Sequence, residues 1–335
     1  MLLFTGVRLI LFRNSPNVFL RVTSTSYFSN NKQNFFNHVP INRRIFDIVP
    51  KRYHPYLHLS RWDKPTGSWL LYWPGAWSIA FGATSLIPDI RLLCLFGVGA
   101  VLLRGAGCTI NDLWDKDFDR HVERTKTRPL ATGQLTTSQA VTWLGIQLSL
   151  GFLILIQLNW PSIVLGVLSL IPVLFYPTMK RFTYWPQFFL GMTFSWGALM
   201  GYTAATGTLN LAIIIPLYFA GIAWTLHYDT IYGHQDKSDD ILIGVKSTAL
   251  RLGNDTKLWL RTFSTVMLSH LLTTGLVVGQ TWPYYLGLVG VGYHLHKQIE
   301  TVNLNDASSC WKAFSSNRIT GWIIFGSILA GNALR

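Results

Sequence analysis

Nine long apolar segments follow one another along the 335-residue chain, and they constrain its fold more than any other feature. They span residues 67–86, 90–111, 137–158, 161–178, 185–204, 209–228, 257–279, 281–297 and 318–334. Most of them approach the roughly 20 residues that a helix needs to cross a bilayer. Only 13% of the residues are charged, about half the share that is usual in soluble domains. The sequence therefore predicts an all-α, polytopic membrane protein with about nine transmembrane helices.

The connections between these segments alternate in charge. Every second connection carries lysines and arginines, whereas the connections between them are short and nearly uncharged. Because positively charged loops stay on the inner side of a membrane, the basic loops and the N-terminus are expected to share that side. The acidic clusters lie in the same loops. Topology and phosphate binding therefore explain the net charge of +13 better than a nucleic-acid partner, and we expect none.

The first 46 residues differ in composition from the rest of the chain. They contain no acidic residue, but they contain six basic residues and a cluster of serines and threonines. A basic, serine-rich and acid-poor start is typical of mitochondrial transit peptides, with a secretory signal as the main alternative. We therefore expect a mitochondrial transit peptide at residues 1–46 and one membrane domain at residues 47–335. In the mitochondrial inner membrane, the basic loops would face the matrix.

An acidic stretch directly follows the second apolar segment. Only 15 residues of the chain are acidic, and four of them lie between Asp112 and Asp119. Asn111, Asp115 and Asp119 are spaced by four residues and share one face of a helix, with Asp112 beside them. Carboxylates at the end of an apolar helix are costly, so they are candidates for a functional site. Several oxygen ligands on one face suit Mg²⁺ that also carries phosphate oxygens.

A second acidic stretch follows the sixth apolar segment. At an offset of 117 positions, three acidic residues of the first stretch coincide with three of the second: Asp112, Asp119 and Glu123 with Asp229, Asp236 and Asp240. Both stretches end an even-numbered segment on the same side. The match predicts two related four-helix units followed by a final helix, with the two acidic helix ends facing each other across a central cavity. The alternative is that acidic residues merely share solvated loops.

Two opposed carboxylate clusters with nearby basic residues favour a diphosphate bound through Mg²⁺. Carboxylates bind the ions, and lysines and arginines neutralise the outer phosphate oxygens. A stabilised diphosphate leaves readily from an allylic carbon, which suits a prenyl diphosphate with its tail between membrane helices. Arg104 lies inside the second apolar segment, seven residues before Asn111. Such a charge needs a partner, which is either a carboxylate of a second substrate or a structural partner such as Asp63.

The motifs that carry this chemistry resemble those of the UbiA-type intramembrane prenyltransferases, over roughly residues 57–334. The first signature is Asn111-Asp112-x-x-Asp115-x-x-x-Asp119, and the second runs from Tyr228-Asp229-Thr230-Ile231-Tyr232 to Asp239-Asp240. The second signature, residues 176–181 and the stretch Arg61-x-Asp63-Lys64-Pro65 are most similar to the 4-hydroxybenzoate polyprenyltransferase branch. The resemblance implies Mg²⁺-dependent transfer of a polyprenyl chain from an all-trans polyprenyl diphosphate to the 3-position of 4-hydroxybenzoate. Diphosphate would be released in this early step of ubiquinone biosynthesis.

The resemblance also implies a role for individual residues. The catalytic carboxylates would be Asp115, Asp119, Asp236 and Asp240, and the metal ligands would add Asn111 and Asp229. Asp112 is a further candidate metal ligand because it lies beside the face formed by Asn111, Asp115 and Asp119. The diphosphate would be bound by Lys180, Arg181 and Arg128, and the aromatic acid by Arg104. The residues themselves add Lys246, a basic residue after the second acidic stretch, as a further candidate for the diphosphate. Tyr232 is either a hydroxyl donor to the diphosphate or a packing residue. A haem O or menaquinone-type prenyltransferase and a secondary transporter are the alternatives. An association with other proteins of ubiquinone synthesis is left open.

Overall fold

The computed structural model describes residues 43–120, 125–237, 240–241 and 244–335. Within these ranges the secondary structure is entirely helical. Residues 1–42 of the expected transit peptide lie outside the described ranges, so the boundary at residue 46 stays a prediction. Two short helices, α2 (Arg43–Ile48) and α3 (His54–Leu59), come before the first long helix.

Nine helical segments occupy the positions of the nine predicted spans within the described ranges. They are α4 (Thr66–Phe81), α5 (Ile90–Trp114), α7 (Thr137–Leu155), α8–α9 (Trp160–Leu168 and Leu170–Phe182), α10–α11 (Pro186–Phe194 and Trp196–Thr206), α12 (Leu211–Gly233), α15 (Thr256–Val278), α16 (Trp282–Thr301) and α17 (Ala307–Ala333). By length and composition alone, four of the described segments could cross a membrane: α5, α7, α8–α9 and α12. The other five pack against these four or against one another. The predicted all-α membrane fold is confirmed.

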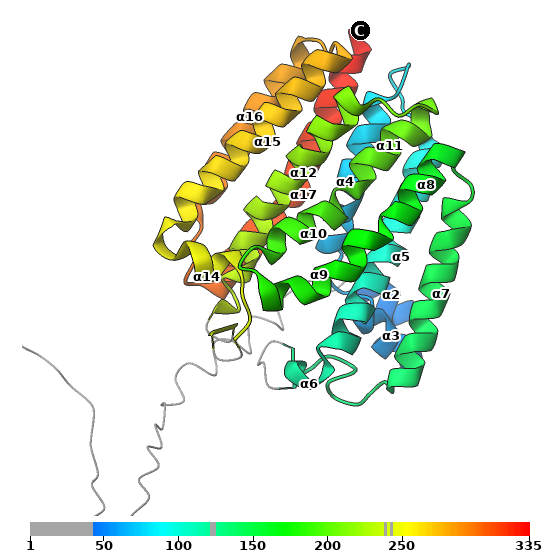
Figure 1. The fold of residues 1–335 in the computed structure, drawn as a ribbon, viewed down its shortest axis with the longest axis vertical. Helices are drawn as coiled ribbons and strands as arrows, with labels where there is room; N and C mark the ends of the chain where they lie inside the picture. The colour runs from blue at the N-terminus through cyan, green and yellow to red at the C-terminus, as the bar shows by residue number, and fades with distance from the viewer. Residues whose placement is uncertain (1–42, 121–124, 238–239, 242–243) are drawn as a thin grey trace, which may run out of the picture. The chain divides into compact units, whose positions relative to one another are not determined.

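Two of the predicted spans are broken rather than straight. The break between α8 and α9 falls at Ser169, three residues before Pro172. Proline has no amide hydrogen to donate to the carbonyl of Leu168, so the helix cannot continue regularly through this point. The Ser169 hydroxyl donates instead to the carbonyl of Gly166 at 2.6 Å. The break allows α9 to turn toward the end of the bundle at which α5 finishes (Figure 1).

The packing of the helices follows the predicted internal repeat. Helix α5 packs between α4 and α7, and α12 packs in the same way between α10–α11 and α15. The last helix, α17, packs on α16, α4 and α12. Figure 1 shows α12 in the middle of the bundle, with α7 at one edge and α15 and α16 at the opposite edge. Helices α5 and α12, which precede the two acidic stretches, therefore occupy equivalent places in the two units.

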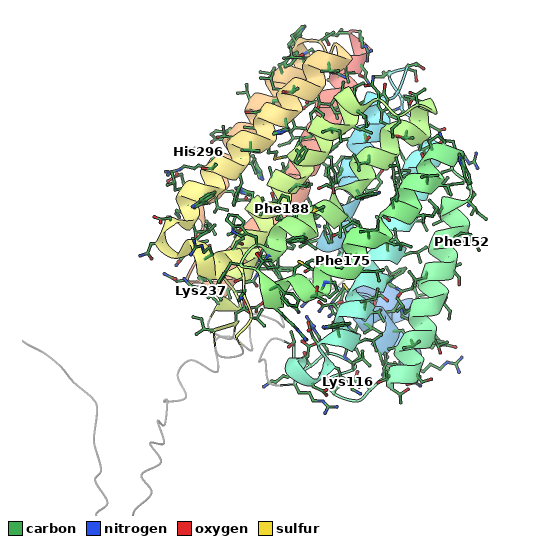
Figure 2. All side chains as sticks on the ribbon, in the orientation of Figure 1. Lys116, Phe152, Phe175, Phe188, Lys237 and His296 are labelled. Atoms are coloured by element: carbon green, nitrogen blue, oxygen red, sulfur yellow. The ribbon has the colours of Figure 1, made fainter. Side chains whose placement is uncertain are left out.

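The edge helices expose apolar side chains. Phe152 on α7 and Phe175 on α9, both labelled in Figure 2, are 58% and 59% exposed. By contrast, most of α12 is buried within the bundle. Large exposed apolar surfaces are unfavourable in water but match the hydrocarbon of a bilayer. The exposed surface of α7, α8 and α9 therefore faces lipid.

The core joins the helices that carry the site. Trp77 on α4 donates from Nε1 to the carbonyl of Gly321 on α17 at 3.0 Å, and Trp224 on α12 donates to Asn317 Oδ1 at 2.9 Å. Small residues bring α4 and α11 close together: a Cβ on Gly201 would lie 2.5 Å from the carbonyl oxygen of Gly75. Such close backbone approach is the usual basis of helix association in membranes. The central helices are thereby held in fixed positions relative to one another.

Candidate active site

The first acidic stretch keeps its helical spacing in the structure. Asn111 lies in the last turn of α5, Asp115 caps that helix, and Asp119 ends the short helix α6 (Lys116–Asp119). The Asp115 amide donates to the Asn111 carbonyl at 2.9 Å, and the Asp119 amide donates to the Asp115 carbonyl at 2.8 Å. These bonds carry the register of α5 into α6. The backbone thus keeps the four-residue spacing across the junction of α5 and α6, and the common face of the three side chains stays a prediction.

Asp115 is paired with a lysine from another helix, α9. Lys180, in the last turn of α9, donates from Nζ to Asp115 Oδ2. Asp115 is 7% exposed, and such a charge-assisted bond to a buried carboxylate is stronger than one between neutral groups. The Lys180 carbonyl accepts from the Lys246 amide at 2.9 Å. Lys180 thus connects the first acidic stretch with the loop that follows the second.

Asp112 and Asp119 share one arginine. Arg128 donates from Nη1 to Asp119 Oδ2 at 2.7 Å and lies 2.9 Å from Asp112 Oδ1. Arg61, in the loop between α3 and α4, donates from Nη2 to both Asp112 oxygens at 2.8 and 2.9 Å. Asp112 is 0% exposed, so its charge is compensated by these arginines and not by water. Arg61 belongs to a stretch that carries the family resemblance, but no role at the site was predicted for it.

The second acidic stretch lies at the end of α12. Asp229 is in the last turns of this helix, and Asp236 and Asp240 follow it, with the Asp240 amide donating to the Asp236 carbonyl at 2.8 Å. Asp229 lies within electrostatic range of the hydroxyls of Tyr176 on α9 and Tyr228 on α12. Figure 2 shows Lys116 and Lys237, which follow Asp115 and Asp236, toward the lower end of the bundle.

Arg104 is placed between the two units. Its guanidinium carbon lies 5.5 Å from the centre of the Phe194 ring on α10. Its charge acts on the hydroxyls of Tyr176 and Tyr228, as that of Asp229 does. The Nε atom is buried and has no hydrogen-bond partner among the described residues. Helix α4 approaches it so closely that a Cβ on Gly67 would lie 2.5 Å from Nε.

Asp63 is not the partner of Arg104. A structural ion pair between the two was one of the alternatives left by the sequence. In the structure, Asp63 Oδ2 lies 3.7 Å from Nδ1 of His58. The described residues thus leave the guanidinium of Arg104 facing Phe194 and without a carboxylate, as a binding site for an acidic ligand would require.

For the other three predicted diphosphate ligands, Arg181, Lys246 and Tyr232, the contacts described are with aromatic rings or a backbone carbonyl. The guanidinium of Arg181 lies 5.8 Å from the centre of the Trp114 ring. Lys246 donates from Nζ to the Phe182 carbonyl at 3.3 Å. The ring of Tyr232 packs 4.7 Å from that of Phe314, between centres. Their binding roles stay predictions.

The donor set fits Mg²⁺ only together with a diphosphate. Within the described ranges, no three His, Cys, Asp or Glu side chains gather closely enough to bind a metal ion by themselves. Mg²⁺ is commonly held by one or two carboxylates and by substrate phosphates, with water completing the octahedron. Burial raises the pKa of Asp119 above its ordinary value, and the nearby charge of Arg128 offsets only part of that rise. Further positive charge near this carboxylate would therefore be favourable.

Comparisons with known proteins identify the family of the chain. The UbiA prenyltransferase family matches residues 71–325. The mitochondrial 4-hydroxybenzoate polyprenyltransferase of Drosophila melanogaster is 55% identical over 282 residues, covering 84% of this chain and 72% of the relative. The mitochondrial 4-hydroxybenzoate polyprenyltransferase of Homo sapiens is 52% identical over 289 residues, covering 86% and 78%.

Solved structures share the fold. A UbiA homolog from Aeropyrum pernix K1 superposes with a TM-score of 0.67 at 22% identity, covering 78% of this chain and 97% of that chain. A UbiA homolog from Archaeoglobus fulgidus bound to GPP and Mg²⁺ gives 0.65 at 16% identity, covering 84% and 100%. At these identities the likeness shows the fold alone. With a family match over most of the sequence and relatives more than half identical, the chain belongs to the UbiA prenyltransferase family.

Proposed function

We propose that this protein transfers a polyprenyl chain from an all-trans polyprenyl diphosphate to the 3-position of 4-hydroxybenzoate, releasing diphosphate, in ubiquinone biosynthesis. The observation that carries the proposal is that buried carboxylates meet lysine and arginine side chains at the end of apolar helices. Asp115 and Asp119 are paired with Lys180 and Arg128 there. The relatives with 55% and 52% identity are named 4-hydroxybenzoate polyprenyltransferase, which supports 4-hydroxybenzoate as the acceptor.

The diphosphate would lie between the two acidic stretches. Asn111, Asp115 and Asp119 would hold Mg²⁺ from one side, and Asp236 and Asp240, with Asp229 nearby, from the other. When bound, Mg²⁺ would neutralise the diphosphate and stabilise it as a leaving group. The carboxylates that it engages would release their present cations.

Lys180 and Arg128 are the cations so released. Each now donates to a carboxylate of the first stretch. Both side chains are long enough to turn from that carboxylate to a neighbouring phosphate oxygen. Arg181, Lys246 and Tyr232 would contribute to the outer side of the diphosphate. The prenyl tail would extend between the helices toward the lipid-facing surface of α7, α8 and α9.

The aromatic acid would bind through its carboxylate to Arg104. Seven residues of helix separate Arg104 from Asn111, which corresponds to about 10 Å along α5. This spacing leaves room for one aromatic ring between the guanidinium and the diphosphate. The ring carbon beside the hydroxyl could then face the allylic carbon. Phe194, beside Arg104, offers a ring face that would stabilise positive charge as the diphosphate departs.

The expected location is the mitochondrial inner membrane, with the acidic stretches facing the matrix. The names of the relatives and the apolar helices support a multi-pass mitochondrial membrane protein. The basic loops on the side of the acidic stretches support the matrix orientation. Protease protection of a tag on the loop at residues 303–306, compared between intact and opened mitoplasts, tests the orientation.

The activity is tested with the full chain in membranes, Mg²⁺, a polyprenyl diphosphate and ring-labelled 4-hydroxybenzoate. Formation of a lipid-soluble labelled product that disappears in EDTA is expected. A matched pair of variants in α6 serves as the control: Asp119→Asn should abolish product, whereas Asp117→Asn, at an exposed position off the predicted face, should not. Transfer to a haem or a naphthoate, but not to 4-hydroxybenzoate, would refute the proposed acceptor.

A further inference from the structure

Arg61 adopts a backbone conformation that is unfavourable for its residue type. Its φ of +58° is the one positive value at a non-glycine among the described residues. The left-handed region brings Cβ close to the following carbonyl, so a side chain held there needs compensating contacts. The compensation is local: the Arg61 amide donates to the His58 carbonyl at 3.1 Å, and Nη1 donates to the same carbonyl at 2.8 Å.

The guanidinium of Arg61 is anchored at both of its ends. Nη1 also donates to the Leu59 carbonyl at 3.3 Å, at the end of α3. Nη2 donates to both oxygens of Asp112, as described above. The side chain is 17% exposed. Arg61 is therefore a fixed part of the fold, whereas the Nη1 atom of Arg128 is shared between two carboxylates.

The charge balance among Arg61, Arg128, Asp112 and Asp119 shows why a fixed Arg61 affects what Arg128 can do. Arg61 and Arg128 carry two positive charges, and Asp112 and Asp119 carry two negative charges when ionised. A fully buried carboxylate without a counter-ion is strongly unfavourable. If Arg61 were absent, Asp112 would depend on Arg128 alone. Arg128 could then not move away without leaving the buried carboxylate of Asp112 with no counter-ion.

We propose that Arg61 is a positioning residue that acts as the permanent counter-ion of Asp112 and so frees Arg128 to move from Asp119 to the diphosphate. The inference rests on the proposed function, because it concerns the same diphosphate. It also assigns Asp112 the role of an anchor for two arginines, and not that of a metal ligand. Both Asp112 oxygens already accept from Arg61 at 2.8 and 2.9 Å.

The test measures binding of inorganic diphosphate with Mg²⁺ to the full chain in nanodiscs by calorimetry. In Arg61→Gly, the glycine accepts the positive φ, so the variant removes the guanidinium without adding backbone strain. We expect Kd for diphosphate to rise about 10- to 100-fold, as the loss of one charge-assisted contact to the ligand would give. In turnover assays, KM for the prenyl diphosphate should rise while KM for 4-hydroxybenzoate stays the same.

The double variant Arg61→Gly with Asp112→Asn decides between charge and structure. With Asp112 neutral, Arg128 is no longer needed in the cluster, so binding should recover to within about threefold of the wild type. A merely structural role of Arg61, or direct binding of Mg²⁺ by Asp112, predicts that the double variant binds no better than Arg61→Gly. Either that result or wild-type binding by Arg61→Gly overturns the inference.

Two further measurements keep the test decisive. Arg52→Gly removes an exposed arginine from the neighbouring turn at Lys51–Tyr53 and should leave Kd unchanged. If Arg61→Gly does not fold, as judged by thermal unfolding, Arg61→Asn replaces it, since asparagine also tolerates the left-handed region. Failure of the wild type to bind diphosphate with Mg²⁺ would refute the proposed function and not only the role of Arg61.

Discussion

The substitution Gly67→Ala should displace the Arg104 guanidinium while Arg104 itself is left unchanged. The new Cβ would lie 2.5 Å from Nε, 3.0 Å from Nη2 and 3.1 Å from Cζ of Arg104. Ordinary contact begins at 3.4 Å, so the guanidinium must move by about 0.9 Å. It can do so because it is the end of a flexible side chain. A misplacement of this size costs on the order of 10- to 100-fold in kcat/KM when the displaced group orients a substrate.

The assay varies each substrate separately. If Arg104 binds the carboxylate of 4-hydroxybenzoate, KM for the acid should rise and KM for the prenyl diphosphate should not. Alanine is a better helix former than glycine by up to about 1 kcal/mol, so the fold should be retained. The matched control is Gly99→Ala on α5, where the new Cβ would meet its nearest neighbour at 4.0 Å. Equal changes in both KM values, or none, would refute the assignment of Arg104.

Three other predictions concern the carboxylates, the stability at low pH and the packing of α4. Asp119→Ala and Asp236→Ala should each abolish turnover and leave membrane insertion intact; substantial activity in either would contradict the two-cluster site. Burial, with a smaller contribution from Lys237, lowers the pKa of His234 from 6.5 to about 4, so the unfolded chain binds this proton more readily. The unfolding temperature should therefore fall as the pH drops from 6.5 toward 4, and His234→Gln should reduce that slope; an unchanged slope would exclude His234 as its cause. Gly201→Ala places a Cβ 2.5 Å from a backbone oxygen of α4 and should lower the unfolding temperature in detergent, unlike Gly99→Ala.

The fold was largely predictable because lipid restricts the choices. A chain in a bilayer must satisfy its backbone hydrogen bonds internally, so each apolar segment of sufficient length predicts one helical crossing. The breaks at Ser169 and Ser195 were not predicted. Hydropathy is insensitive to such breaks, because a broken helix is as apolar as a straight one. Only proline hints at them, and Pro177 and Pro216 lie inside α9 and α12 without dividing them.

The site was predictable where its residues are close in sequence. The spacing of Asn111, Asp115 and Asp119 follows from helical geometry alone, and the structure keeps it. Arg61 contacts Asp112 across 51 positions, and such a pairing depends on how the loop before α4 returns to the end of α5. Its left-handed backbone conformation is likewise a property of the folded chain.

The bond from the Lys246 amide to the Lys180 carbonyl has a consequence for recombination between family members. Lys180 belongs to the first four-helix unit and Lys246 to the second, so the two halves of the active site are joined through main-chain atoms as well as through charge. A chimera with its crossover between α9 and α10 would take these partners from different parents. The loop after Asp240 would then have to fit an α9 terminus with which it did not evolve. Crossovers before α8, which keep Lys180 and Lys246 in one parental block, should be tolerated more often.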